Sequence, residues 1–110
     1  MLFDVRTTRR GDRTVVAVVG DVDLASLPGL RSELDRADGP VVVLDLAGVD
    51  HFDPLAFGVV LTGSMRARRR GAEFVVVCAG RPRELFAESG VDQILTVERP
   101  PEAQRHPAGA

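Results

Sequence analysis

Two short and almost uninterrupted apolar runs limit the possible folds of this chain more than any other feature of its sequence. They are VVVLDL at 41–46 and AEFVVVCA at 72–79, and a stretch with helical spacing of apolar residues separates them, from about Pro54 to Arg70. Strands that are apolar on both faces are typical of parallel sheets. Neighbouring parallel strands need a long crossover, which is usually a helix. The order therefore predicts a right-handed β-α-β unit.

The remaining elements extend this unit at both ends. Two β-branched runs joined by the polar link RRGD predict an antiparallel hairpin. A helix is expected after Ser26, which suits its N-cap, and Pro28 suits its first turn. The predicted strands and helices are 2–8, 13–20, 26–37, 41–46, 54–70, 72–79, 81–89 and 93–97. This order, β-β-α-β-α-β-α-β, predicts an α/β fold whose mixed sheet has the hairpin at its edge and helices packed over it.

Length and composition set the class of protein. A chain of 110 residues forms one domain, for which we expect the bounds 1–99. The tail at 100–110 has three prolines and no periodicity, so we expect it to be disordered. A net charge of -2 and the absence of Trp and Tyr argue against nucleic-acid binding. A single cysteine, no apolar signal segment and no run long enough to span a membrane favour a cytoplasmic protein.

Several acids cluster where the predicted strands end, which is where open α/β sheets bind ligands. One interpretation is a metal or acid–base site, and the other is that Asp53 caps a helix while the rest anchor turns. Neither His51, in the expected loop before the long helix, nor His106 has an evident partner, and no ligand spacing supports a metal. We therefore expect no cofactor, no metal and no enzymatic activity. The acids are Asp21, Asp23, Asp45, Asp50 and Asp53.

The long helix has two distinct faces. At about 100° per residue its natural core face comprises Phe57, Val60, Leu61, Ser64 and Ala67. The opposite face carries Leu55, Val59, Thr62 and Arg66. Scattered exposed apolar residues are common, but an apolar stripe leading into a polar rim is also typical of a protein-binding helix. The residues alone leave both interpretations open.

Three segments in order resemble the STAS domain, and within it the stand-alone bacterial anti-sigma factor antagonists. VVGDVDLASLPGLRSEL is similar to the family's strand-Gly-acid-x-Asp-helix segment, and RRRGAEFVVV to its next helix-to-strand step. Between them, VVVLDLAGVDHFDPLAFGVVL is similar to its Leu-Asp-Leu strand followed by an Asp-Ser-Ser-Gly-x-Gly helix start. The resemblance covers about residues 3–98 and implies the STAS fold.

The resemblance also implies a function, partner switching. In that family an unphosphorylated antagonist binds an anti-sigma factor, usually a serine kinase, and phosphorylation of the motif's second serine releases it. Here Asp53 matches the motif's Asp and Gly58 its last Gly, whereas Pro54, Leu55 and Ala56 replace the residues between. The phosphoacceptor position is therefore occupied by Leu55. The resemblance implies a partner-binding surface formed by Asp23, Asp50, His51, Asp53, Pro54, Leu55, Val59, Thr62 and Arg66.

Two other functions remain open at this point. Some small STAS proteins are structural subunits that support the ATPase of a membrane lipid transporter, and others build signalling scaffolds. A small-molecule enzyme at the acidic strand ends is a third interpretation, which requires a bound ligand or metal. The sequence leaves the identity of the partner, the input signal and the oligomeric state undetermined.

Overall fold

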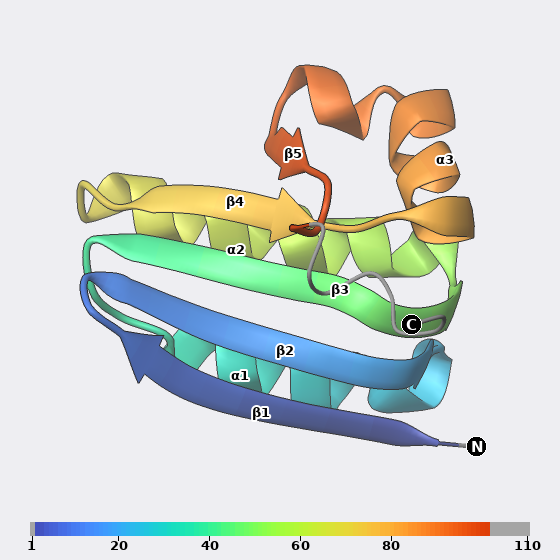
Figure 1. Cartoon of the computed structure of the whole chain (residues 1–110), viewed down its shortest axis with the longest axis horizontal. Helices are drawn as coiled ribbons and strands as arrows, with labels where there is room; N and C mark the ends of the chain where they lie inside the picture. Colours follow the sequence, from blue (N-terminus) through green and yellow to red (C-terminus); the bar gives the residue numbers. More distant parts are fainter. Residues whose placement is uncertain (1, 102–110) are drawn as a thin grey trace.

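Five strands form one mixed sheet in the order β1-β2-β3-β4-β5 (Figure 1). The computed structural model describes residues 2–101. β1 pairs with β2 antiparallel through a two-residue turn, and the other neighbours are parallel. This confirms the predicted mixed sheet with a hairpin at its edge. The strands are β1 (Phe3–Arg10), β2 (Arg13–Val22), β3 (Val41–Phe52), β4 (Glu73–Val77) and β5 (Thr96–Glu98).

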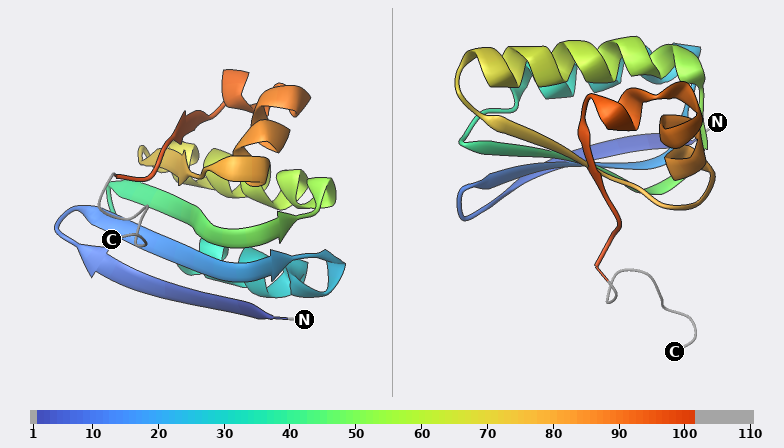
Figure 2. Two further views of the ribbon diagram at one scale, coloured as in Figure 1. Left: turned by 45° about the vertical axis from the view of Figure 1, so that its right-hand side comes forward. Right: turned by 90° about the horizontal axis from the view of Figure 1, so that it is seen from above.

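Two helices, α1 (Leu27–Arg36) and α2 (Phe57–Arg69), lie side by side over one face of this sheet (Figure 2, right). They pack closely where Gly63 of α2 meets Leu34 of α1. A side chain at position 63 would crowd this contact, because its Cβ would lie only 3.1 Å from Cδ1 of Leu34. The third helix, α3 (Gly80–Ser89), sits at the end of the sheet where β3 finishes. The described residues also include three short 3₁₀ helices: η1 (Leu24–Ser26), η2 (Pro54–Ala56) and η3 (Val91–Gln93).

The third strand is twice as long as predicted. The sequence predicts that it ends at residue 46, but β3 continues to Phe52 beside β2. The two strands stay paired across register shifts, and an ordinary side chain at position 48 would crowd Val19, because a Cβ there would lie 3.1 Å from its Cγ2. Those irregularities interrupt the two-residue alternation by which a strand is recognised. The expected loop at 50–53 is therefore strand as far as residue 52.

The core lies between the sheet and the two covering helices. On α2 the buried residues are Val60, Gly63, Ser64 and Ala67, while Phe57 and Leu61 pack against the core from its margin. The predicted core face of the long helix is therefore confirmed. Of the tail, only Pro100 and Pro101 belong to the described residues, and Pro100 is buried. The expectation of disorder for the rest falls outside them. Within residues 2–101, no helix is long and apolar enough to cross a membrane.

Burial of Cys78 makes the stability of the fold dependent on pH. Its side chain is fully buried, and desolvation raises its pKa to about 11. The folded protein therefore holds this proton at pH values where the unfolded chain, with a thiol pKa of about 8.5, has released it. We expect the free energy of unfolding to fall by about 2 kcal/mol between pH 9 and pH 11. Urea titrations across this range measure the slope.

The matched control for this experiment is Cys78→Ala, which removes the titrating group. The variant should be less stable at neutral pH but should lose most of the decline above pH 9. An identical decline in both proteins would show that another group causes it.

Candidate functional site

Two helices begin next to each other at one end of the sheet. β2 and β3 end in register, with Val22 opposite Phe52, and the N–H of Asp53 donates to the carbonyl of Val22 at 2.8 Å. Each strand is followed by one aspartate and then a 3₁₀ turn that leads into α1 or α2. Both helix starts therefore lie at the same end of the sheet, the carboxyl ends of its parallel strands, where α/β sheets usually bind their ligands.

The two aspartates cap these turns. Asp53 accepts a hydrogen bond from the N–H of Leu55 at 2.9 Å, with Pro54 at the first position of the turn, as expected from the sequence. Asp23 accepts from the N–H of Ser26 at 3.1 Å, and the serine hydroxyl accepts from the N–H of Asp23 at 2.8 Å. Ser26 thus occupies the N-cap position of α1, but its hydroxyl belongs to the preceding turn. Each cap contributes about 1 kcal/mol.

Leu55 projects from the start of α2 and is 63% exposed. It lines a shallow groove of about 290 Å³ between the two helices, together with Gly58, Val59 and Thr62 of the same helix and Arg31 of α1. Leu24 lies at the neighbouring helix start, directly after the capping residue Asp23, and is 61% exposed. Two apolar side chains therefore remain in solvent at adjacent helix termini.

The other face residues of α2 differ in how far they reach solvent. Thr62 is exposed as expected, and Arg66 is exposed but forms an ion pair with Asp35 of α1 at 3.2 Å. Val59 lines the groove but is partly buried and packs against the core, so the prediction that it points away from the core is wrong. The reason is that α1 lies beside α2 and covers part of the flank that an isolated helix would leave open.

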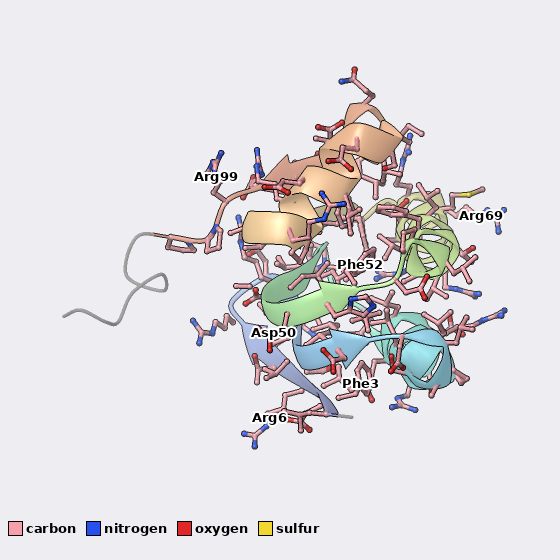
Figure 3. The ribbon with its side chains drawn as sticks, turned by 90° about the vertical axis from the view of Figure 1, so that its right-hand side faces the viewer. Phe3, Arg6, Asp50, Phe52, Arg69 and Arg99 are labelled. Atoms are coloured by element: carbon pink, nitrogen blue, oxygen red, sulfur yellow. The ribbon has the colours of Figure 1, made fainter. Side chains whose placement is uncertain are left out.

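Asp50 and His51 are exposed residues of β3 rather than of a loop. In Figure 3, which looks onto this end of the sheet, Asp50 points to the side away from α1 and α2. It is therefore not brought together with Leu55. Asp45 lies in the middle of β3, not at its end, and accepts from the N–H of Ala47. The five acids do not converge, and within residues 2–101 no three His, Cys, Asp or Glu side chains could hold a metal ion.

Three aromatic rings pack together where β3, α2 and α3 meet. Phe52 at the end of β3 lies 5.2 Å from Phe57 and 5.4 Å from Phe86 of α3, and Phe57 lies 4.9 Å from Phe86 (ring centroids). Phe52 and Phe86 are buried, and Figure 3 shows Phe52 inside this end of the molecule. Such pairs stabilise by about 0.5–1.5 kcal/mol beyond area burial. The rings therefore pack the end of β3, the first residue of α2 and α3 against one another.

Sequence reasoning missed Arg31 and Gly58 as residues of this groove, and Leu24 as a second exposed leucine at the neighbouring helix start. A signal for Leu24 exists, because DLAS at 23–26 parallels DPLA at 53–56. Nothing in the sequence places Arg31, since its role depends on the way α1 lies against α2. Of the residues predicted for a partner surface, Leu55, Val59 and Thr62 share the groove. Pro54 is exposed beside them, while Asp23 and Asp53 serve the helix caps.

Comparison with known proteins gives a family and a fold. A family model described as "Mlab, STAS domain" matches residues 5–97. No curated protein matches the chain.

Three solved structures show the same fold. An anti-sigma factor antagonist from Mycobacterium paratuberculosis is 19% identical, with a TM-score of 0.82 over 88% of this chain and 86% of that one. A putative anti-sigma factor antagonist from Thermotoga maritima is 12% identical, with a TM-score of 0.76 over 91% and 89%. The Bacillus cell fate determinant SpoIIAA in its phosphorylated form is 15% identical, with a TM-score of 0.69 over 94% and 95%.

Proposed function

This chain belongs to the STAS domain family, and from that premise we propose that it is a non-enzymatic binding module that sequesters an anti-sigma factor of the serine kinase-like class. The observation that carries the proposal is Leu55, an exposed apolar side chain at the capped start of α2. It stands where the STAS motif has its phosphorylated serine. An exposed leucine beside a polar rim is suited to burial against a partner.

The proposed docking surface comprises the groove, Leu24 at the neighbouring helix start, and Arg66 and Asp35 at the rim. The groove residues are Arg31, Leu55, Gly58, Val59 and Thr62. The two leucines supply apolar contact, because the complex is stabilised when a partner removes their exposed apolar surface from water. The rim charges set orientation and the rate of association more than affinity. Asp23 and Asp53 contribute by holding the two helix starts, and Asp50 lies outside the contact.

Binding is constitutive in this proposal because residue 55 carries no hydroxyl. Thr62, the exposed hydroxyl of the groove, lies seven residues further along the chain, about two helical turns away. Two buried serine hydroxyls are already engaged: Ser26 donates to the carbonyl of Asp23 at 2.9 Å, and Ser64 donates to that of Leu61 at 3.0 Å. Both serines are also buried, so a kinase cannot reach them without opening the fold. The complex is then controlled by the amount of each protein and not by phosphorylation at the usual position.

The test is to measure, by calorimetry, the affinity for each serine kinase-like anti-sigma factor from the same organism. We expect Leu55→Glu to weaken binding to its partner about 100-fold or more, because a carboxylate must lose its water in the interface. Ile94→Glu is the matched control, since Ile94 is a similarly exposed aliphatic residue (61%) outside the docking surface. It should leave affinity unchanged. Equal effects of the two substitutions, or no binding to any such protein, would contradict the proposal.

A second candidate is a structural subunit that supports the ATPase of a membrane lipid transporter. The observation that favours it is the description of the matching family model, which names Mlab. The two functions differ in the partner that co-purifies with the tagged protein, a kinase-like anti-sigma factor or a transporter ATPase. Genes for one or the other beside this gene distinguish the same two candidates at little effort.

A further inference from the structure

We propose that two copies of this chain associate by antiparallel pairing of their β1 strands. This inference is independent of the proposed function. β1 is the outermost strand at one border of the sheet, and within residues 2–101 no other strand pairs with its outer side (Figure 1). An open edge of eight residues presents a row of backbone donors and acceptors that a second strand can fill.

The register of the hairpin shows which backbone groups face outward. Phe3 pairs with Gly20, so Leu2 lies opposite Asp21, and the N–H of Asp21 donates to the carbonyl of Leu2 at 2.7 Å. In an antiparallel ladder every second residue bonds to a given neighbour. The even-numbered residues of β1 therefore bond to β2. The N–H and C=O groups of Phe3, Val5, Thr7 and Arg9 point away from it.

These outward groups restrict the two-fold registers that can form. With Val5 opposite Val5 of the second copy, the outward groups of Phe3 meet those of Thr7, and Asp4 lies opposite Arg6 of the second copy. A shift of one residue per strand in one direction brings Asp4 opposite Asp4, and in the other direction Arg6 opposite Arg6. Like charges directly opposite destabilise a sheet. The register centred on Val5 avoids both.

Charge complementarity selects a second copy as the occupant of this edge. Asp4 and Arg6 lie on the same face of β1, because Arg6 Nε is 3.7 Å from Asp4 Oδ2. Both side chains are largely exposed, and Figure 3 shows Arg6 extending from the border of the sheet. In the pair of strands each aspartate would gain an arginine from the other copy. Val5, half-buried against the core, would meet its own counterpart at the two-fold axis.

The proposed pair leaves the groove at Leu55 uncovered. β1 lies at the border of the sheet beside α1, whereas α2 lies on the far side of α1 (Figures 1 and 2). Leu55 belongs to η2, which leads into α2. A dimer would therefore carry two open docking surfaces and bind a bivalent partner with increased avidity.

The experiment is sedimentation of the full chain over about a hundred-fold range of concentration, which covers weak dissociation constants. We expect a concentration-dependent monomer–dimer equilibrium for the natural sequence. Asp4→Arg and Arg6→Asp should each weaken it about ten-fold or more, because both cross-strand pairs become repulsive. Arg69→Asp makes the same charge change as Arg6→Asp at the exposed end of α2, so it is the matched control and should leave the equilibrium unchanged. Circular dichroism verifies that all variants fold.

Mixing the two charge variants tests the register itself. A chain with arginine at position 4 and a chain with aspartate at position 6 should form a mixed dimer about as stable as the natural one, because every opposite pair is again complementary. A natural chain that stays monomeric throughout would overturn the proposal, as would charge variants that still dimerise. Failure of the mixture to restore dimers would overturn the register and with it the proposed interface.

Discussion

Replacing Phe86 with alanine is expected to lower the free energy of unfolding by about 3–5 kcal/mol, the range for a fully buried phenylalanine. The ring is fully buried and contacts both Phe52 and Phe57, so its removal leaves a cavity between α3, the end of β3 and the start of α2. That amount is a large part of the total stability of a small domain. Urea unfolding followed by circular dichroism measures it.

Leu85→Ala is the control within the same helix, because Leu85 is only partly buried. It should cost less than half as much, and Phe86→Leu should recover most of the loss. If Phe86→Ala changes stability no more than Leu85→Ala, the three rings do not hold α3 in place.

The second large effect is expected at position 55. Leu55→Ser restores the hydroxyl of the STAS motif at an exposed, capped helix start, so the partner kinase with ATP should phosphorylate this variant stoichiometrically. The phosphate adds about 1.5 to 2 negative charges, which the interface would have to desolvate. A switch from 1:99 to 99:1 needs about 10⁴-fold differential affinity, and we expect release of at least about 100-fold. Intact mass and affinity are measured before and after the reaction.

The natural chain under the same conditions should gain no phosphoryl group and should stay bound. Ile94→Ser places a hydroxyl at an equally exposed position elsewhere and should also remain unmodified. Phosphorylation of the natural chain on any residue that releases the complex would contradict constitutive binding. An unmodified Leu55→Ser variant would show that the kinase no longer recognises this helix start.

The parts of the fold that the sequence predicts are those governed by local chemistry. Gly11, with a φ of 61°, allows the tight turn between β1 and β2, and the spacing of Val60, Ser64 and Ala67 gives the buried face of α2. The extension of β3 from 46 to 52 depends instead on its pairing with β2 through irregular register. The pattern of residues within one segment contains no information about which strand will lie beside it.

In the candidate site, too, some features follow from adjacent residues and others depend on tertiary packing. The cap at Asp53 and the exposure of Leu55 follow from residues adjacent in sequence, and the structure agrees with both. The half-burial of Val59, the direction of Asp50 and the presence of Arg31 in the groove depend on how α1, α2 and β3 lie against each other. Those relations are tertiary, so no spacing within one segment encodes them.

The cap at Asp53 has a consequence for how this protein can evolve. Because its carboxylate satisfies the N–H of residue 55, the start of α2 does not depend on the side chain at that position. Natural selection can therefore exchange a hydroxyl for an alkyl group there with little loss of folding stability. Some leucine and serine codons differ by a single base, so one mutational step can remove or restore a hydroxyl at this position while the rest of the domain stays as it is.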